Sequence, residues 1–146
     1  MLRRDYILKL IQDLFAAISN LLERDGDEAV RQKEIEALYA TFGGDKDFFR
    51  KAEKDEMIST VAKVAASAQG VAPDQLSADE MLQRIELLAA LMYADFKVSD
   101  ISDNLRRDVA ARALSLYNRV IDSSDTYSQE RFDRVDELER FLSKDK

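Results

Sequence analysis

Few residues in this chain interrupt regular structure: it has one proline and four glycines among 146 residues. Tight turns depend on these two residue types, so sandwiches and barrels built from many hairpins are excluded. Abundant alanine, leucine and glutamine, with charged residues at 35% of the chain, favour helix. At roughly 150 residues per domain, the length predicts one domain. We therefore expect an all-α fold, a single helical domain over residues 1–146 built from six or seven helices in antiparallel hairpins.

Apolar residues recur at steps of three and four along most of the sequence, which is the period of an amphipathic helix. The expected helices cover residues 5–24, 27–42, 46–68, 77–96, 102–121 and 128–142. A charged run at 51–56 divides the third segment, so one helix or two are both open there. The stretch 69–76 holds the only proline. We expect a sub-boundary at this linker, between N-terminal helices in 1–68 and C-terminal helices in 77–146.

The segment from Met81 to Phe96 is apolar around most of its circumference, which predicts the central and most buried helix. Ser77 and Glu80 have the spacing of a capping box at its start. We expect this helix to pair antiparallel with Leu105–Ile121, and Phe132–Leu142 to pack across both. The predicted core then includes Leu88, Leu116 and Leu138.

The chain contains no cysteine and no histidine. It therefore lacks the ligands of the common zinc, haem and iron–sulfur sites, and the bases of Ser-His-Asp and Cys-His nucleophiles. We expect no cofactor and no metal. Because no disulfide can form, a cytoplasmic location is expected.

The formal net charge is −7, which disfavours binding to nucleic acid or to an anionic membrane. The long helix at 102–121 carries four arginines, but four acids lie in or beside it, so no basic stripe for nucleic acid is expected. Lys9, Gln12 and Asp13 interrupt the apolar residues of the first helix. Neither a membrane span nor an export signal is expected there.

Two segments resemble helical hairpins of the tetratricopeptide kind: the turn Asp25-Gly26-Asp27-Glu28-Ala29 after the first helix, and the helix from Ala113 to Ile121. The repeat's tryptophan and terminal proline are absent, and no 34-residue repeat is visible.

Both ends of the chain also resemble a family of small bacterial all-helical proteins of unknown function with a tetratricopeptide-like C-terminal half. Arg4-Asp5-Tyr6-Ile7, Leu114 to Val120 and Tyr127-Ser128-Gln129-Glu130 carry this similarity. It does not extend over residues 43–75. The resemblance implies a fold and a bacterial source, and it implies no activity.

Three pairs of carboxylates have i, i+3 spacing: Glu53 with Glu56, Asp100 with Asp103, and Asp133 with Asp136. Two such pairs on facing helices can hold Mg²⁺, because this ion prefers carboxylate oxygens and substrate phosphates. The alternative function is therefore a magnesium-dependent, all-helical nucleotide phosphohydrolase. Polar surroundings favour solvated helix faces instead.

Aromatic side chains at helix edges are the candidate binding residues, because tyrosine is enriched at protein interfaces. The expected partner-binding tyrosines are Tyr6, Tyr39, Tyr93 and Tyr117. The first helix has a wide apolar stripe that suits internal packing, pairing with a second copy as a homodimer, or a membrane surface. We expect a nonenzymatic helical interaction or scaffold module that binds a protein or peptide partner.

Overall fold

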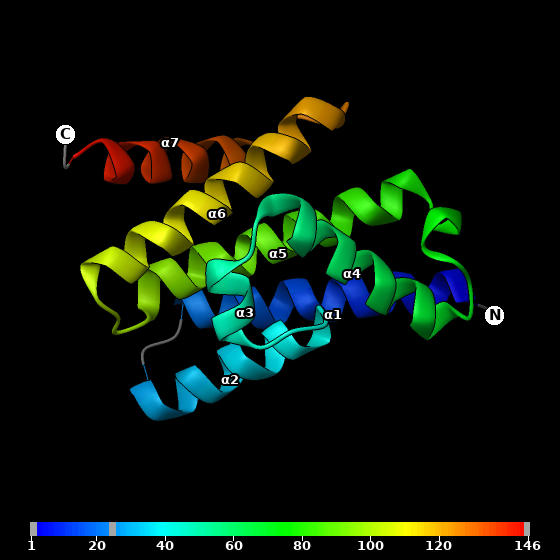
Figure 1. Ribbon diagram of the computed structural model, residues 1–146, viewed down its shortest axis with the longest axis horizontal. Coiled ribbons are helices and arrows are strands. Elements are labelled where there is room, and N and C mark those ends of the chain that lie inside the picture. The colour runs from blue at the N-terminus through cyan, green and yellow to red at the C-terminus, as the bar shows by residue number, and fades with distance from the viewer. Residues whose placement is uncertain (1–2, 24–25, 145–146) are drawn as a thin grey trace.

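The computed structural model describes residues 3–23 and 26–144, with side chains from Tyr6 onward. It has seven α-helices and one short 3-10 helix, and no strand occurs in this part of the chain (Figure 1). The all-α prediction is confirmed. The elements are α1 (Arg3–Glu23), α2 (Glu28–Thr41), α3 (Lys46–Lys51), α4 (Lys54–Gln69), η1 (Pro73–Gln75), α5 (Ala78–Val98), α6 (Asp103–Ser123) and α7 (Gln129–Ser143).

Helix α5 lies at the centre, as its apolar circumference predicts. In Figure 1, α7, α6, α5 and α1 follow one another from the top of the view downward, and α2 lies below them. Helices α3 and α4 pack across the α5–α6 pair. Helix α7 packs along α6 and also reaches α5, where Phe141 stacks edge-on against Phe96 with ring centroids 4.9 Å apart. The three leucines predicted as core, Leu88, Leu116 and Leu138, are all fully buried.

The segment 46–69 forms two helices, which decides between the two alternatives left open by the sequence. Ala52 ends α3 in an extended conformation and is buried. Arg112 of α6 donates to the carbonyl oxygens of Lys51 and Ala52, each at 2.8 Å. These carbonyls would otherwise lack a partner at the end of the helix, so a side chain 60 residues away stabilises the break.

Two more arginines of α6 serve the ends of other helices. Arg106 donates to the carbonyl oxygens of Phe96 and Ser99, the latter at 2.8 Å, at the end of α5. Arg107 donates to the carbonyl of Leu142 near the end of α7 at 3.1 Å. Each guanidinium lies at the C-terminal end of a helix, where the helix dipole favours positive charge. Arg106 and Arg107 therefore stabilise the ends of α5 and α7.

Serine side chains begin the last three helices. Ser77, Ser102 and Ser128 each accept a hydrogen bond from the backbone N–H three residues later. The expected capping box at Ser77 is only half formed, since the Glu80 carboxylate accepts from Gln69 at 2.6 Å and Arg84 at 2.8 Å instead. The Glu80 carboxylate therefore binds the buried guanidinium of Arg84 instead of the backbone N–H of Ser77.

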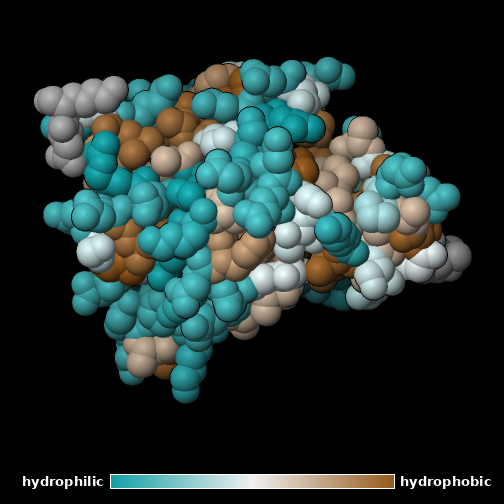
Figure 2. Space-filling model, in the orientation of Figure 1, coloured by the Kyte–Doolittle hydropathy of each residue, from teal (hydrophilic) through white to brown (hydrophobic). Residues whose placement is uncertain are grey.

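A single hydrophobic core runs from Leu14 in α1 to Leu138 in α7 and includes residues on both sides of the 69–76 segment. Hydrophilic residues cover most of the face seen in Figure 2, and hydrophobic residues reach it only in small, separate patches. Among the described helices, none is both long enough and apolar enough to cross a membrane.

Candidate helix-docking groove

The most enclosed polar group is the carboxylate of Asp95, in the middle of α5 and fully buried. Arg50 of α3 donates two hydrogen bonds to it, at 2.7 and 2.9 Å. The hydroxyls of Tyr39 and Ser99 donate to the same carboxylate at 2.7 and 2.6 Å. This cluster joins α2, α3 and α5. It is closed to solvent and its donors are satisfied, so it holds the fold together rather than receiving a ligand.

Ionisation in this cluster follows from burial and charge. Burial raises the pKa of Tyr39 well above 10, and the Asp95 carboxylate raises it further. Burial acts to lower the pKa of Arg50, but hydrogen bonds and charge from Asp95 outweigh that effect and raise it. A neutral phenol and a charged guanidinium therefore face one carboxylate.

An open groove runs along α5 between α1 and α7. The section lined by Phe15 and Arg131 has a volume of about 340 Å³. The section lined by Leu22 and Lys97 has a volume of about 530 Å³. The two sections share the lining residues Glu130 and Arg134, so they adjoin each other, and we call the two together the α1–α7 groove. Its lining is contributed by α1 (Ile11, Phe15, Leu22), α5 (Gln83, Glu86, Leu87, Ala90, Tyr93, Lys97), α6 (Tyr117) and α7 with its N-cap (Ser128, Glu130, Arg131, Asp133, Arg134, Glu137).

The α1 wall of the groove is apolar. Phe15 is 52% exposed, an unusual exposure for a large aromatic side chain, while Leu14 and Ile18 on the neighbouring face are buried in the core. Ile11 and Leu22 are half-buried at the same wall. Because this wall contains no charge, it suits the apolar side of another protein segment.

The α7 wall is polar and held in place by its own contacts. Arg131 forms a two-bond ion pair with Glu86 at 2.8 and 3.0 Å. Arg134 donates to the Tyr117 hydroxyl at 3.0 Å and lies 4.9 Å above the Tyr93 ring. Both arginines lose little additional freedom on binding a partner, because these contacts already fix them.

Two tyrosines behind this wall are neutral over the physiological range. Burial raises the pKa of Tyr117 to about 12, although Arg134 acts to lower it. Burial, followed by a hydrogen bond to Glu137, raises the pKa of Tyr93. Tyr93 donates to Glu137 at 2.5 Å, and Lys97 donates to the same carboxylate at 2.5 Å.

The structure separates the four tyrosines expected to bind a partner. Tyr93 and Tyr117 line the groove but are largely buried, at 8% and 1% exposure. Tyr39 is fully buried in the Asp95 cluster and reaches no surface. Tyr6 is 61% exposed but lies nine residues before Phe15, about two and a half turns, and therefore on the opposite side of α1.

Sequence reasoning did not single out Phe15, Arg131 or Arg134. Phe15 was visible as an extra apolar residue beside the main stripe of the first helix. The two arginines carried no local signal, because their partners Glu86, Tyr93 and Tyr117 lie on other helices.

The carboxylate pairs do not form a metal cage. All six side chains are exposed. Glu53 and Glu56 lie at the start of α4, Asp100 lies between α5 and α6, Asp103 is the first residue of α6, and Asp133 and Asp136 lie on α7. In the described part of the chain, no three acidic side chains gather where they could hold a metal ion. The three pairs lie on separate elements, so the arrangement of these carboxylates gives no support to the phosphohydrolase interpretation.

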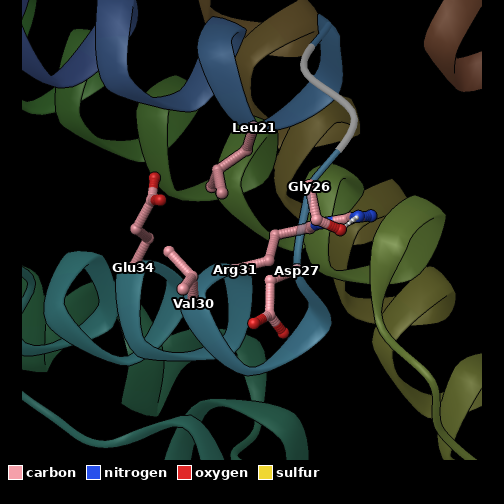
Figure 3. Close-up of a pocket in the computed structure, with 6 residues that line it drawn as sticks. All are labelled: Leu21, Gly26, Asp27, Val30, Arg31 and Glu34. Atoms are coloured by element: carbon pink, nitrogen blue, oxygen red, sulfur yellow. Dashed lines mark hydrogen bonds between the residues drawn. The ribbon is translucent and has the colours of Figure 1, made fainter.

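A smaller hollow of about 240 Å³ lies between the end of α1 and the start of α2 (Figure 3). Leu21 and Val30 face each other across it, while Arg31 turns away to donate to the Gly26 carbonyl at 2.7 Å. The charged side chains Asp27, Arg31 and Glu34 point in different directions. They converge on no common point, so this hollow is a weaker candidate than the α1–α7 groove.

Comparison with known proteins gave no relative: no family model, no curated protein and no solved structure matches the chain.

Proposed function

We propose that the chain is a nonenzymatic helical interaction or scaffold module, and that the α1–α7 groove is its binding surface for a helix of a protein or peptide. The observation that carries the proposal is Phe15, half-exposed at the centre of an uncharged wall that borders a groove. Amphipathic helices bind such grooves by laying their apolar face against them.

The composition of the groove supports the proposal. Aromatic residues and arginine are enriched at protein interfaces and at their energetic hot spots. Here Phe15 lines one section together with Tyr117, Arg131 and Arg134, and Tyr93 lines the adjoining section. The two arginines are fixed by Glu86 and Tyr117, so the surface is already formed before a partner arrives.

Further expectations from the sequence belong to the same proposal. The tetratricopeptide-like C-terminal half, the bacterial family resemblance and the cytoplasmic location are consistent with an interaction module. A homodimer through the N-terminal helix is one form that its binding could take. Cell fractionation tests the location independently.

A photo-crosslinking experiment tests the proposed function. A photoreactive phenylalanine analogue replaces Phe15 in one variant and Val30 in a matched control, since both residues are 52% exposed but Val30 lies on α2 outside the groove. Irradiation in living cells should join the Phe15 variant to a discrete protein, identified by mass spectrometry, and leave the Val30 variant largely unjoined. Equal labelling from both positions, or none from Phe15, contradicts the proposal.

A further inference from the structure

The groove side of α1 carries a repeating stripe. Its members are Leu8, Gln12, Phe15, Ser19 and Leu22, which are spaced by four, three, four and three residues. This is the heptad period by which two helices pack against each other. Leu8 is 43% and Phe15 52% exposed, so these two side chains lie largely outside the core of one chain, whereas Leu22 is partly buried against it.

The stripe is also uncharged, although charged residues make up 35% of the chain. The chain as a whole carries a net charge of −7, so contact between acidic faces of two copies would place like charges together. The α1 stripe adds no charge of its own to such a contact.

The dimensions of the stripe and the groove agree. Leu22 lies 14 positions after Leu8, and on the α5 floor Lys97 lies 14 positions after Gln83. At about 1.5 Å per residue, both are about 21 Å long. Leu8 and Gln83 line a separate hollow beside the start of α5, and Leu22 and Lys97 line one section of the α1–α7 groove. Helix α1 therefore forms a ridge that runs parallel to α5, beside a groove of equal length.

We propose that the α1–α7 groove is occupied by α1 of a second copy of this chain, with the two α1 helices parallel. This inference rests on the proposed function and names its partner. A two-fold axis parallel to α1, between the ridge and the groove, places each ridge in the groove of the other copy. Such an interface is self-complementary, as two-fold contacts are.

The pairing places like positions opposite each other. Leu8, Phe15 and Leu22 then meet their own counterparts, and Gln12 and Ser19 take the intervening positions of the heptad. Polar residues at such positions favour one register, in which they face each other rather than an apolar side chain. The parallel arrangement is therefore specified by the same residues that form the contact.

The mass of the protein in solution is the first test. Light scattering after size exclusion should give twice the 16.7 kDa of one chain. Phe15→Glu should weaken association at least about 100-fold, because it places two like charges in a desolvated contact. Val30→Glu, on α2 outside the groove lining, should leave the dimer intact. Circular dichroism checks that both variants fold. A monomeric wild type, or equal effects of the two variants, overturns the inference.

Cysteine cross-linking tests the orientation, and the absence of native cysteine makes each variant unambiguous. Mild oxidation should join Leu8→Cys to itself and Phe15→Cys to itself, whereas Val30→Cys, outside the groove lining, should form no disulfide-linked dimer. An antiparallel pair would instead leave Leu8→Cys unjoined and would join Leu8→Cys to Leu22→Cys in a mixture. That pattern overturns the parallel dimer.

These results are separable from those for the proposed function. A monomeric wild type whose Phe15 analogue joins a different protein refutes the dimer and leaves the interaction module standing. A groove that joins no protein in cells, with a monomeric wild type, refutes both.

Discussion

Replacing Asp95 with asparagine should destabilise the fold severely. The carboxylate is fully buried and accepts four hydrogen bonds, two of them from Arg50, whose side chain is 5% exposed. Asp95→Asn keeps the shape but leaves the guanidinium buried without its counter-ion. Breaking one side of a buried pair costs about 3–5 kcal/mol, a large part of the roughly 5–15 kcal/mol that stabilises a whole domain.

Urea denaturation followed by circular dichroism at 222 nm measures this loss. The control is Asp108→Asn, which removes an exposed pair with Lys51 at 3.7 Å and should cost less than about 0.5 kcal/mol. Adding Arg50→Met to Asp95→Asn should cost less than the sum of the two single changes, since the pair acts as a unit. An Asp95→Asn protein as stable as the Asp108→Asn control refutes the reasoning.

Three further predictions concern two substitutions and a change of pH. Urea denaturation measures the loss of stability for the two substitutions. Leu116→Ala, at a fully buried site, should cost about 2–5 kcal/mol. Gly43→Ala should destabilise more than Gly70→Ala, because both have positive φ but only at Gly43 does the new Cβ meet Val64 Cγ2, at 2.6 Å. Burial raises the pKa of Tyr117 to about 12, above its unfolded value near 10. Its contribution to stability is therefore complete below pH 10 and is lost as the pH rises toward 12, which absorbance at 295 nm and circular dichroism should show together.

The helices were predictable because each depends on nearby residues. The apolar period located α1, α5 and α6, and serine at positions 77, 102 and 128 marked where helices begin. The division between α3 and α4 was not predictable, because Arg112 stabilises it from 60 residues away. A local pattern carries no information on such a contact.

The proposed binding surface was harder to predict from the sequence than the fold was. An aspartate at position 95 within the apolar run of α5 was a signal for a buried ion pair, but nothing local named Arg50 as its partner. The groove depends on α1 and α7 flanking α5, and their lining residues lie more than 100 positions apart. Of the groove's lining, the sequence predicted Tyr93 and Tyr117 as binding residues, while Phe15 was visible only as an apolar residue beside the core stripe of the first helix.

Hydroxyl-radical footprinting of Phe15 tests most directly whether a protein covers the groove. The rate of Phe15 modification in cells that make the protein is compared with the rate in dilute purified protein. Tyr127, 70% exposed and outside the groove lining, serves as the internal reference. Relative to Tyr127, Phe15 should be modified more slowly in cells than in dilute solution. An equal ratio in both conditions contradicts a groove occupied by another chain.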